Sequence, residues 1–225
     1  SRSISSMRQG AQAIQTGMVQ GESIGELIGR IRGSKTSPGV MSISKREATA
    51  LVRTSVMSVA GAARMQTYRA NSDVLDGIEV VATLDARTTP MCAGLDGRRF
   101  DLDGKALDGG SDKPAGPPFH FNCRSTTVPV CKSFAELAGP DSPLSKKQIR
   151  SLEKAVPKGE RASMNGPVPT QTYDAWLKDQ SAETQKEILG PARFELWSRN
   201  KLSMSDLLNH AGQPLTLAEL RQRLK

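Results

Sequence analysis

The sequence predicts an α+β fold that is predominantly helical, with a small, mostly antiparallel sheet, long loops and a C-terminal helical module. Two observations carry this prediction. Apolar residues recur at helical spacing over residues 45–68, and several capped helical segments follow residue 170. Only two short runs, Ile78–Leu84 and Ser125–Val130, have the β-branched composition of strands, and a long segment rich in Gly, Asp and Pro separates them.

The elements follow one another with clear boundaries. Ser44 and Ser145 each begin a capping-box pattern, which predicts helices over about residues 45–68 and 144–156. We expect a loop over residues 134–143, before the second of these helices, and a hinge over residues 157–169, after it, because proline and glycine recur in both segments. Short helices after residue 170 share a small core that contains both tryptophans of the chain.

Four ranges are predicted. They are residues 1–40, an N-terminal glycine-rich helical segment; 41–135, an α+β domain; 136–166, a basic helix and hinge; and 167–225, a C-terminal helical module. In the first range, glycine recurs at every fourth position from Gly17 to Gly33. This pattern indicates either close packing on another helix, including self-association with another subunit, or turns at the first and last glycines with only the middle ones in a helix.

Composition limits the class of protein. Hydrophobic residues make up 37% of the 225 residues and aromatic residues only 4%, so we expect an elongated shape or burial supplied by partners. Three cysteines are too few for a secreted disulfide scaffold. No apolar run reaches the length of a membrane span and no signal-peptide pattern is visible, so we expect no membrane partner and synthesis in a cytoplasm. Because the chain begins with Ser1, we expect a fragment, a processed product or the ordered part of a longer protein.

The charge favours an anionic partner. Lys and Arg number 31 against 23 Asp and Glu, a net charge of +8. The densest group of cations lies in and after the predicted helix at 144–156, and it is either a solvated face or a non-specific contact to double-stranded DNA. The candidate DNA-binding residues are Lys146, Lys147, Arg150, Lys154, Lys158 and Arg161.

Polar residues gather at one end of each predicted strand. One group follows the first strand and the other precedes the second, so we expect them to lie close together as a structural cluster that joins the strands. Its members are Asp85, Arg87, Thr88, Cys92, His120, Asn122, Cys123 and Arg124.

Three chemistries remain open for the cysteines in this cluster. Cys92, His120 and Cys123 offer three zinc ligands, and Asp85 or Cys131 would supply the fourth. Alternatively, Cys92 and Cys123 form a disulfide, or the cysteines stay reduced and pack as small apolar residues. A catalytic Cys92 with His120 as base is a weaker interpretation, because no oxyanion-type glycine turn or phosphate-binding loop accompanies it. We therefore expect no catalytic residues.

The two polar motifs together resemble a known family. Asp85-x-Arg87-Thr88-x-x-x-Cys92, followed by His120-x-Asn122-Cys123-Arg124, is similar to the head-morphogenesis domain of tailed bacteriophages, the minor head proteins typified by the F protein of phage Mu. The resemblance covers residues 17–220 and is strongest over residues 83–129. It extends to Arg53-Thr54 and to Tyr173-x-x-Trp176-Leu177, while Thr89 and Ser125 stand where some members have cysteine.

The resemblance implies a structural minor capsid protein of the virion that acts in head assembly. It also implies a place in the head interior or portal region after synthesis in the bacterial host. The implied partners are the portal protein, the major capsid protein and packaged double-stranded DNA. The rival interpretation is a small cysteine- or metal-dependent hydrolase or toxin-like domain, with zinc as its candidate cofactor.

Overall fold

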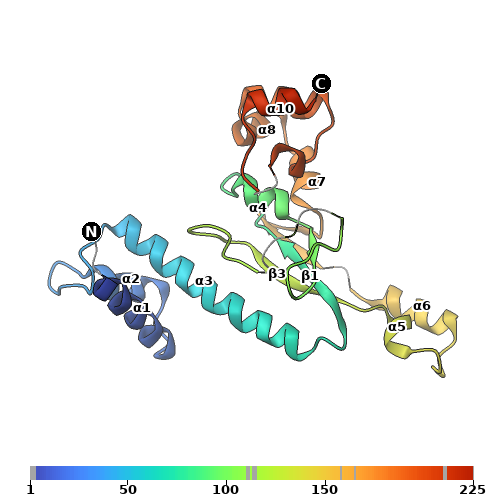
Figure 1. The fold of residues 1–225 in the computed structure, drawn as a ribbon, viewed down its shortest axis with the longest axis horizontal. Coiled ribbons are helices and arrows are strands. Elements are labelled where there is room, and N and C mark those ends of the chain that lie inside the picture. Colours follow the sequence, from blue (N-terminus) through green and yellow to red (C-terminus); the bar gives the residue numbers. More distant parts are fainter. Residues whose placement is uncertain are drawn as a thin grey trace. The chain divides into compact units, whose positions relative to one another are not determined.

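The computed structural model describes residues 4–109, 112, 116–157, 159–164, 166–209 and 212–224. It divides into two compact units. Unit 1 comprises Ser1–Arg64 and Pro117–Arg124, and unit 2 comprises Met65–Gly116 and Ser125–Lys225. Helices and two small antiparallel sheets make up the fold (Figure 1), which confirms the predicted α+β class. The four ranges predicted from the sequence stay a prediction about folding units.

Unit 1 is built from three helices. They are α1 (Ile4–Val19), α2 (Ile24–Arg32) and the first five turns of α3 (Lys45–Ala70). A reciprocal capping box between Ser23 and Glu26 begins α2, as its sequence pattern requires. The buried side chains of this unit form one cluster that draws on all three helices and the connection before α3: Ile14, Leu27, Ile31, Met41, Ala48 and Val52.

The glycines of unit 1 serve two purposes. Gly17 lies inside α1, where an added Cβ would collide with a leucine side chain of α2, so it permits close packing of two helices of the same chain. Gly21 and Gly33 have φ of 76° and 83° and form the turn before α2 and its C-terminal end. The expectation of turns was therefore right for Gly33 and wrong for Gly17. Gly25 and Gly29 are exposed on α2, and self-association through this helix stays a prediction.

A three-stranded antiparallel sheet organises unit 2. Its central strand is β1 (Leu75–Val81), flanked by β2 (Arg99–Phe100) and β3 (Thr126–Cys131). Ile78 and Val80 are buried, at 0% and 2% exposure, because the alternating side chains of β1 point toward the core. The predicted first strand, Ile78–Leu84, begins and ends three residues later than β1 does. Leu84 instead makes an isolated parallel bridge to Ser163.

The segment between β3 and the C-terminal helices departs from the sequence predictions in two places. Helix α5 (Phe134–Ala138) replaces the expected loop, because Ser133 and Glu136 form a capping box. Helix α6 (Lys146–Ala155) is as expected. The expected hinge instead holds a two-stranded antiparallel sheet of β4 (Glu160–Ser163) and β5 (Gly166–Pro169). A short helix, α4 (Pro90–Leu95), also forms where none was predicted, with the Thr89 side chain as its cap.

The C-terminal helices share a core with the sheet region. Helices α7 (Tyr173–Lys178), α8 (Ala182–Leu189), α9 (Pro191–Arg199) and α10 (Leu217–Arg223) and the 3₁₀ helix η1 (Ser205–Leu207) follow the predicted order. Trp176 and Trp197 are buried, as expected. Their cluster also contains Leu84 and Ala93, which come from the segments that follow β1. The helical module is therefore completed by residues from outside it.

A buried ion pair joins four segments of unit 2. Arg161 of β4 contacts Asp96 through two hydrogen bonds of 2.6 and 2.9 Å, and their side chains are 8% and 0% exposed. The Asp96 carboxylate also accepts the backbone N–H groups of Ala82 and Tyr173, each at 2.6 Å. Arg161 in turn donates to the carbonyls of Ala82 and Gln171. These bonds tie the end of β1 and the end of α4 to the β4–β5 sheet and the start of α7.

The described helices include none that is both long enough and apolar enough to cross a membrane.

The ion pair yields a stability prediction. Arg161→Ala leaves the Asp96 carboxylate buried without its cation, so we expect the free energy of unfolding to fall by about 3–5 kcal/mol. Arg199→Ala is the matched control, because its pair with Glu195 is exposed on both sides and should cost less than about 1 kcal/mol. Urea denaturation followed by circular dichroism measures both. Equal losses in the two variants would contradict the role given to the buried pair.

Candidate functional site

The first polar motif folds as a turn that satisfies its own polar groups. Asp85 is 7% exposed, and its Oδ1 accepts the backbone N–H of Arg87 at 3.0 Å. The Thr88 hydroxyl donates to the Thr83 carbonyl at 2.6 Å and lies 3.2 Å from the same Asp85 oxygen. The Asp85 carbonyl accepts the Tyr173 hydroxyl at 3.0 Å, which links the turn to α7. A carboxylate committed to its own backbone in this way is typical of a structural turn.

The second polar motif is held against α3 within unit 1. Asn122 has a φ of 59°, and its backbone N–H donates to the Thr54 hydroxyl at 3.0 Å. The Thr54 hydroxyl donates in turn to the Ala50 carbonyl of the same helix at 2.7 Å. Gly61 allows close approach at the other end of the loop, since an added Cβ would lie 2.5 Å from the Pro117 oxygen. Thr54 and Gly61 therefore fix the position of residues 117–124 on this helix.

His120 and Cys123 form a tight turn inside that loop. The Cys123 N–H donates to the His120 carbonyl at 3.2 Å, and the Cys123 side chain is buried. Nδ1 of His120 lies 2.8 Å from the Phe121 carbonyl oxygen, which can only accept, so Nδ1 donates this hydrogen bond and Nε2 is the ring nitrogen left for a metal. The ligand atoms of His120 and Cys123 lie within 4.8 Å of one another. His120 and Cys123 are therefore close enough for both to bind one metal ion.

The predicted cluster of eight residues divides between the two units. Asp85, Arg87, Thr88 and Cys92 belong to unit 2, and the other four belong to unit 1. Cys92 is buried in the first turn of α4, where its N–H contacts the Thr89 hydroxyl at 3.4 Å. The convergence of all eight, and a zinc ion held by Cys92, His120 and Cys123, stay predictions. Cys131, a candidate fourth ligand, is exposed at the end of β3.

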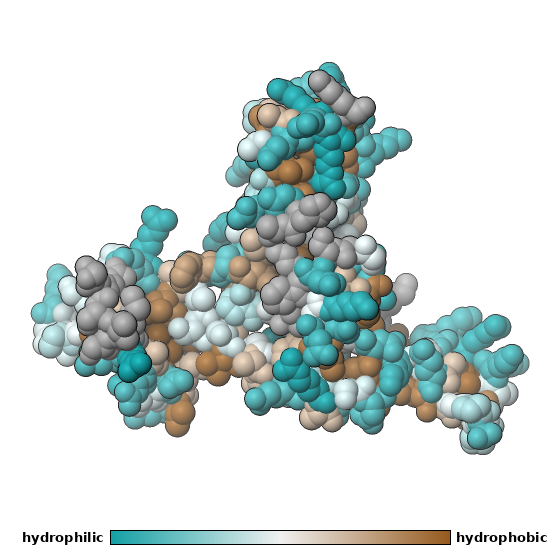
Figure 2. Space-filling view, viewed as in Figure 1, coloured by the Kyte–Doolittle hydropathy of each residue, from teal (hydrophilic) through white to brown (hydrophobic). Residues whose placement is uncertain are grey.

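The predicted DNA-binding residues separate into two groups. Lys146, Lys147, Arg150 and Lys154 are exposed on α6, and Figure 2 shows hydrophilic side chains over this part of the molecule. Arg161 is a correction: its side chain is only 8% exposed and is paired with Asp96, so it cannot also contact phosphate. Lys158 lies outside the described residues. The candidate face is therefore the four cations of α6.

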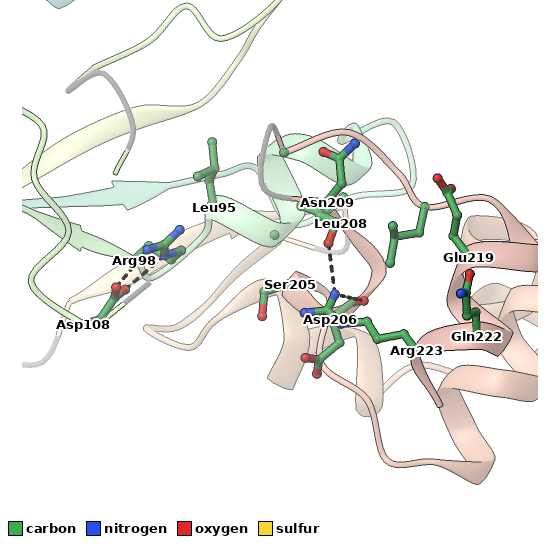
Figure 3. Close-up of a pocket in the computed structure, with 14 residues that line it drawn as sticks. Leu95, Arg98, Asp108, Ser205, Asp206, Leu208, Asn209, Glu219, Gln222 and Arg223 are labelled. Carbon is green, nitrogen blue, oxygen red and sulfur yellow. Dashed lines mark hydrogen bonds and ion pairs between the residues drawn. The ribbon is translucent and has the colours of Figure 1, made fainter. Parts of the chain in front are cut away.

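A cavity of about 980 Å³ lies in unit 2 between the region of α4 and the C-terminal helices (Figure 3). Arg98 on its wall is paired with Asp108 through bonds of 2.9 and 3.2 Å. Arg223 donates to the backbone carbonyls of Asp206 and Leu208, each at 3.2 Å. Both arginines thus serve contacts within the chain. The lining residues that are described include no cysteine or histidine, so the cavity offers no nucleophile of the predicted kind.

The charge of Asp206 at the cavity edge has a structural cause. Burial acts to raise the pKa of this carboxyl group, but hydrogen bonds from the hydroxyl and backbone N–H of Ser203 outweigh burial, so the pKa lies below its usual value. Asp206 is therefore an ionised carboxylate that holds Ser203 at the start of η1. Sequence reasoning did not find the cavity, because its walls come from segments about 100 residues apart that only the fold brings together.

Comparison with known proteins assigns the family. A family model described as Phage Mu protein F like protein matches residues 10–128, more than half of the chain. The match includes both the Asp85 turn and the loop at residues 117–124. The protein is accordingly a phage head-morphogenesis protein. The chain belongs to the phage Mu protein F like family, as its two motifs predicted.

The family match does not extend to the C-terminal helices. The family match ends at residue 128, whereas the resemblance was predicted to extend to residue 220. The search of curated proteins found no match, and neither did the search of solved structures. The C-terminal helices are thus described by the structure alone.

The loop at residues 117–124 yields a second prediction. Asn122 has a positive φ, which asparagine tolerates and a β-branched residue does not. Asn122→Val should therefore lower the free energy of unfolding by about 1–2 kcal/mol, whereas Asn122→Gly should be close to neutral. Thermal and urea denaturation of the two variants measure the difference. Equal stability of the valine and glycine variants would show that this backbone conformation does not matter.

Proposed function

We propose that this protein is a structural minor capsid protein that acts in head assembly near the portal and the packaged DNA. The observation that carries the proposal is the family match over residues 10–128, which contains both polar motifs. Each motif is held by hydrogen bonds to backbone groups. Asp85 accepts the backbone N–H of Arg87 in its own turn, and the backbone N–H of Asn122 donates to the Thr54 hydroxyl of α3. Such bonds fix local structure, which suits a component of an assembly.

A catalytic function is not part of the proposal. An enzyme needs convergent polar groups with access to a substrate. Cys92, the candidate nucleophile, is 3% exposed, and the Asp85 carboxylate is occupied by the N–H of Arg87. The rival interpretation as a cysteine- or metal-dependent hydrolase would require turnover that depends on Cys92.

The proposed partners follow from the family and from the surface charge. Portal and major capsid proteins are the proposed protein partners, and the virion head or portal region is the proposed location. For DNA, the four cations of α6 are all exposed and lie within about eight residues, so they can contact successive phosphates without reading bases. This supports non-specific binding to double-stranded DNA.

The first test of the function uses virus particles. A phage that carries a tagged copy of this protein should contain it in purified assembling or mature heads, as detected by mass spectrometry. Cys92→Ser should leave the number of filled heads unchanged if the residue has no catalytic role. Absence of the protein from both kinds of head, or turnover of a substrate that Cys92→Ser abolishes, would overturn the proposal.

The second test concerns DNA. Lys147→Glu with Lys154→Glu removes two phosphate contacts, so the slope of log K against log salt concentration should become shallower by about 1.8. Arg199→Glu with Arg221→Glu is the matched control, because it makes the same change in net charge at exposed positions of α9 and α10. Fluorescence anisotropy with two unrelated duplexes measures both. The same slope in both double variants would remove α6 from the DNA contact.

A further inference from the structure

The hairpin of α5 and α6, residues 133–156, leaves its apolar side chains uncovered. Neither helix contains a buried residue, and the main packing contact of each is with the other. In Figure 1 the two helices stand beside each other. Five large apolar side chains of this hairpin are between 39% and 56% exposed: Phe134, Leu137, Leu144, Leu152 and Val156.

Local interactions define the two helices but do not cover this face. Ser133 caps α5 and Ser145 caps α6, each through a reciprocal box. The Ser133 hydroxyl and backbone N–H hold the pKa of Glu136 below its usual value, which shows how strongly the cap favours the carboxylate. Helices of five and ten residues are nonetheless marginal without burial of an apolar face. A partner bound to that face would bury these apolar side chains and stabilise both helices.

The distribution of side chains around α6 separates two faces. At about 100° per residue, Ile149, Leu152 and Val156 fall within an arc of about 60°. The four cations fall within an arc of about 100° on the opposite side of the helix. A partner can therefore approach the apolar face without meeting the cations head-on. Duplex DNA offers phosphates and not apolar surface, so it suits the other face.

The apolar face of α6 is complementary to itself. Ile149 and Leu152 lie on either side of Arg150 along the helix and within its apolar arc. Lys146 and Glu153 are seven residues apart, so they occupy the same side of the helix two turns from each other. If two copies of α6 pair antiparallel about an axis near Arg150, Ile149 meets Leu152 of the other copy and Glu153 meets Lys146 of the other copy. Both the apolar and the charged pairs are then repeated by the two-fold symmetry.

We propose that the α5–α6 hairpin binds the same hairpin of a second copy of this chain, with the two α6 helices antiparallel. Ile149 and Leu152 lie at the centre of the contact, and the pairs of Glu153 with Lys146 border it. The contact is smaller than the roughly 800 Å² per partner of a standard stable interface, so association in solution is weak and concentration-dependent. The proposal does not depend on DNA binding: Lys146 lies at the border of the contact, and Lys147, Arg150 and Lys154 of both copies remain outside it.

The first experiment measures mass against concentration for the full chain. Sedimentation equilibrium from about 10 µM to about 1 mM should show the average mass rising from 24.2 kDa toward twice that value. Leu152→Asp places a charge in the apolar face and should return the protein to a monomer throughout. Val59→Asp is the matched control, because Val59 is exposed to a similar degree on α3, and it should associate as the unchanged protein does. Circular dichroism verifies that both variants fold.

The second experiment tests the register of the pairing. Glu153→Lys and Lys146→Glu each place like charges opposite one another and should weaken association several-fold. The double variant restores opposite charges in a self-paired contact and should return association to within about twofold of the original. Only pairing with a second copy predicts this rescue.

Several outcomes would overturn the proposal. They are a monomer at every concentration, association that persists in Leu152→Asp, and a double variant as weak as the single ones. Co-sedimentation with anionic lipid vesicles that Leu152→Asp abolishes, in the absence of any self-association, would assign the face to a lipid surface and would equally overturn the pairing.

Discussion

The ion pair of Arg161 and Asp96 is the contact on which the arrangement of unit 2 depends. Both side chains are withdrawn from water, so their attraction has to offset a large desolvation cost. The geometry achieves this by adding backbone partners: the N–H groups of Ala82 and Tyr173 bond to the carboxylate, and carbonyls accept from the guanidinium. Because these groups come from the end of β1, the end of α4, β4 and the start of α7, one pair fixes four chain segments.

This contact explains how the family region and the C-terminal helices form one structure. The family match ends at residue 128, yet Leu84 and Ala93 inside it complete the core around Trp176 and Trp197. Tyr173 contributes most directly, since its N–H bonds to Asp96 and its hydroxyl bonds to the carbonyl of the Asp85 turn. The motif that identifies the family therefore also supports helices that the family model does not cover.

The cations after residue 145 lie in two kinds of environment, an exposed helix face and a buried ion pair. A cation on a two-faced surface helix remains available to phosphate, as Lys147 and Lys154 do on α6. A cation that pairs with a buried carboxylate is not available to phosphate, and Arg161 is such a cation because it pairs with Asp96. The exposed apolar residues on the other side of α6 give the hairpin its second proposed role, as a contact surface with another copy. A head component that gains burial from its neighbours fits the low aromatic content of the chain.

The sequence by itself determined the elements whose causes are local. Ser23, Ser145 and Thr216 cap their helices through bonds to residues three positions later, and the paired motifs at Asp85 and Asn122 predicted the family. Only the tertiary structure decided the burial of Arg161 and the β4–β5 sheet in place of a hinge. For Arg161 the reason is distance along the chain: it finds Asp96 65 residues away, and no local pattern records which charges will meet when the chain folds.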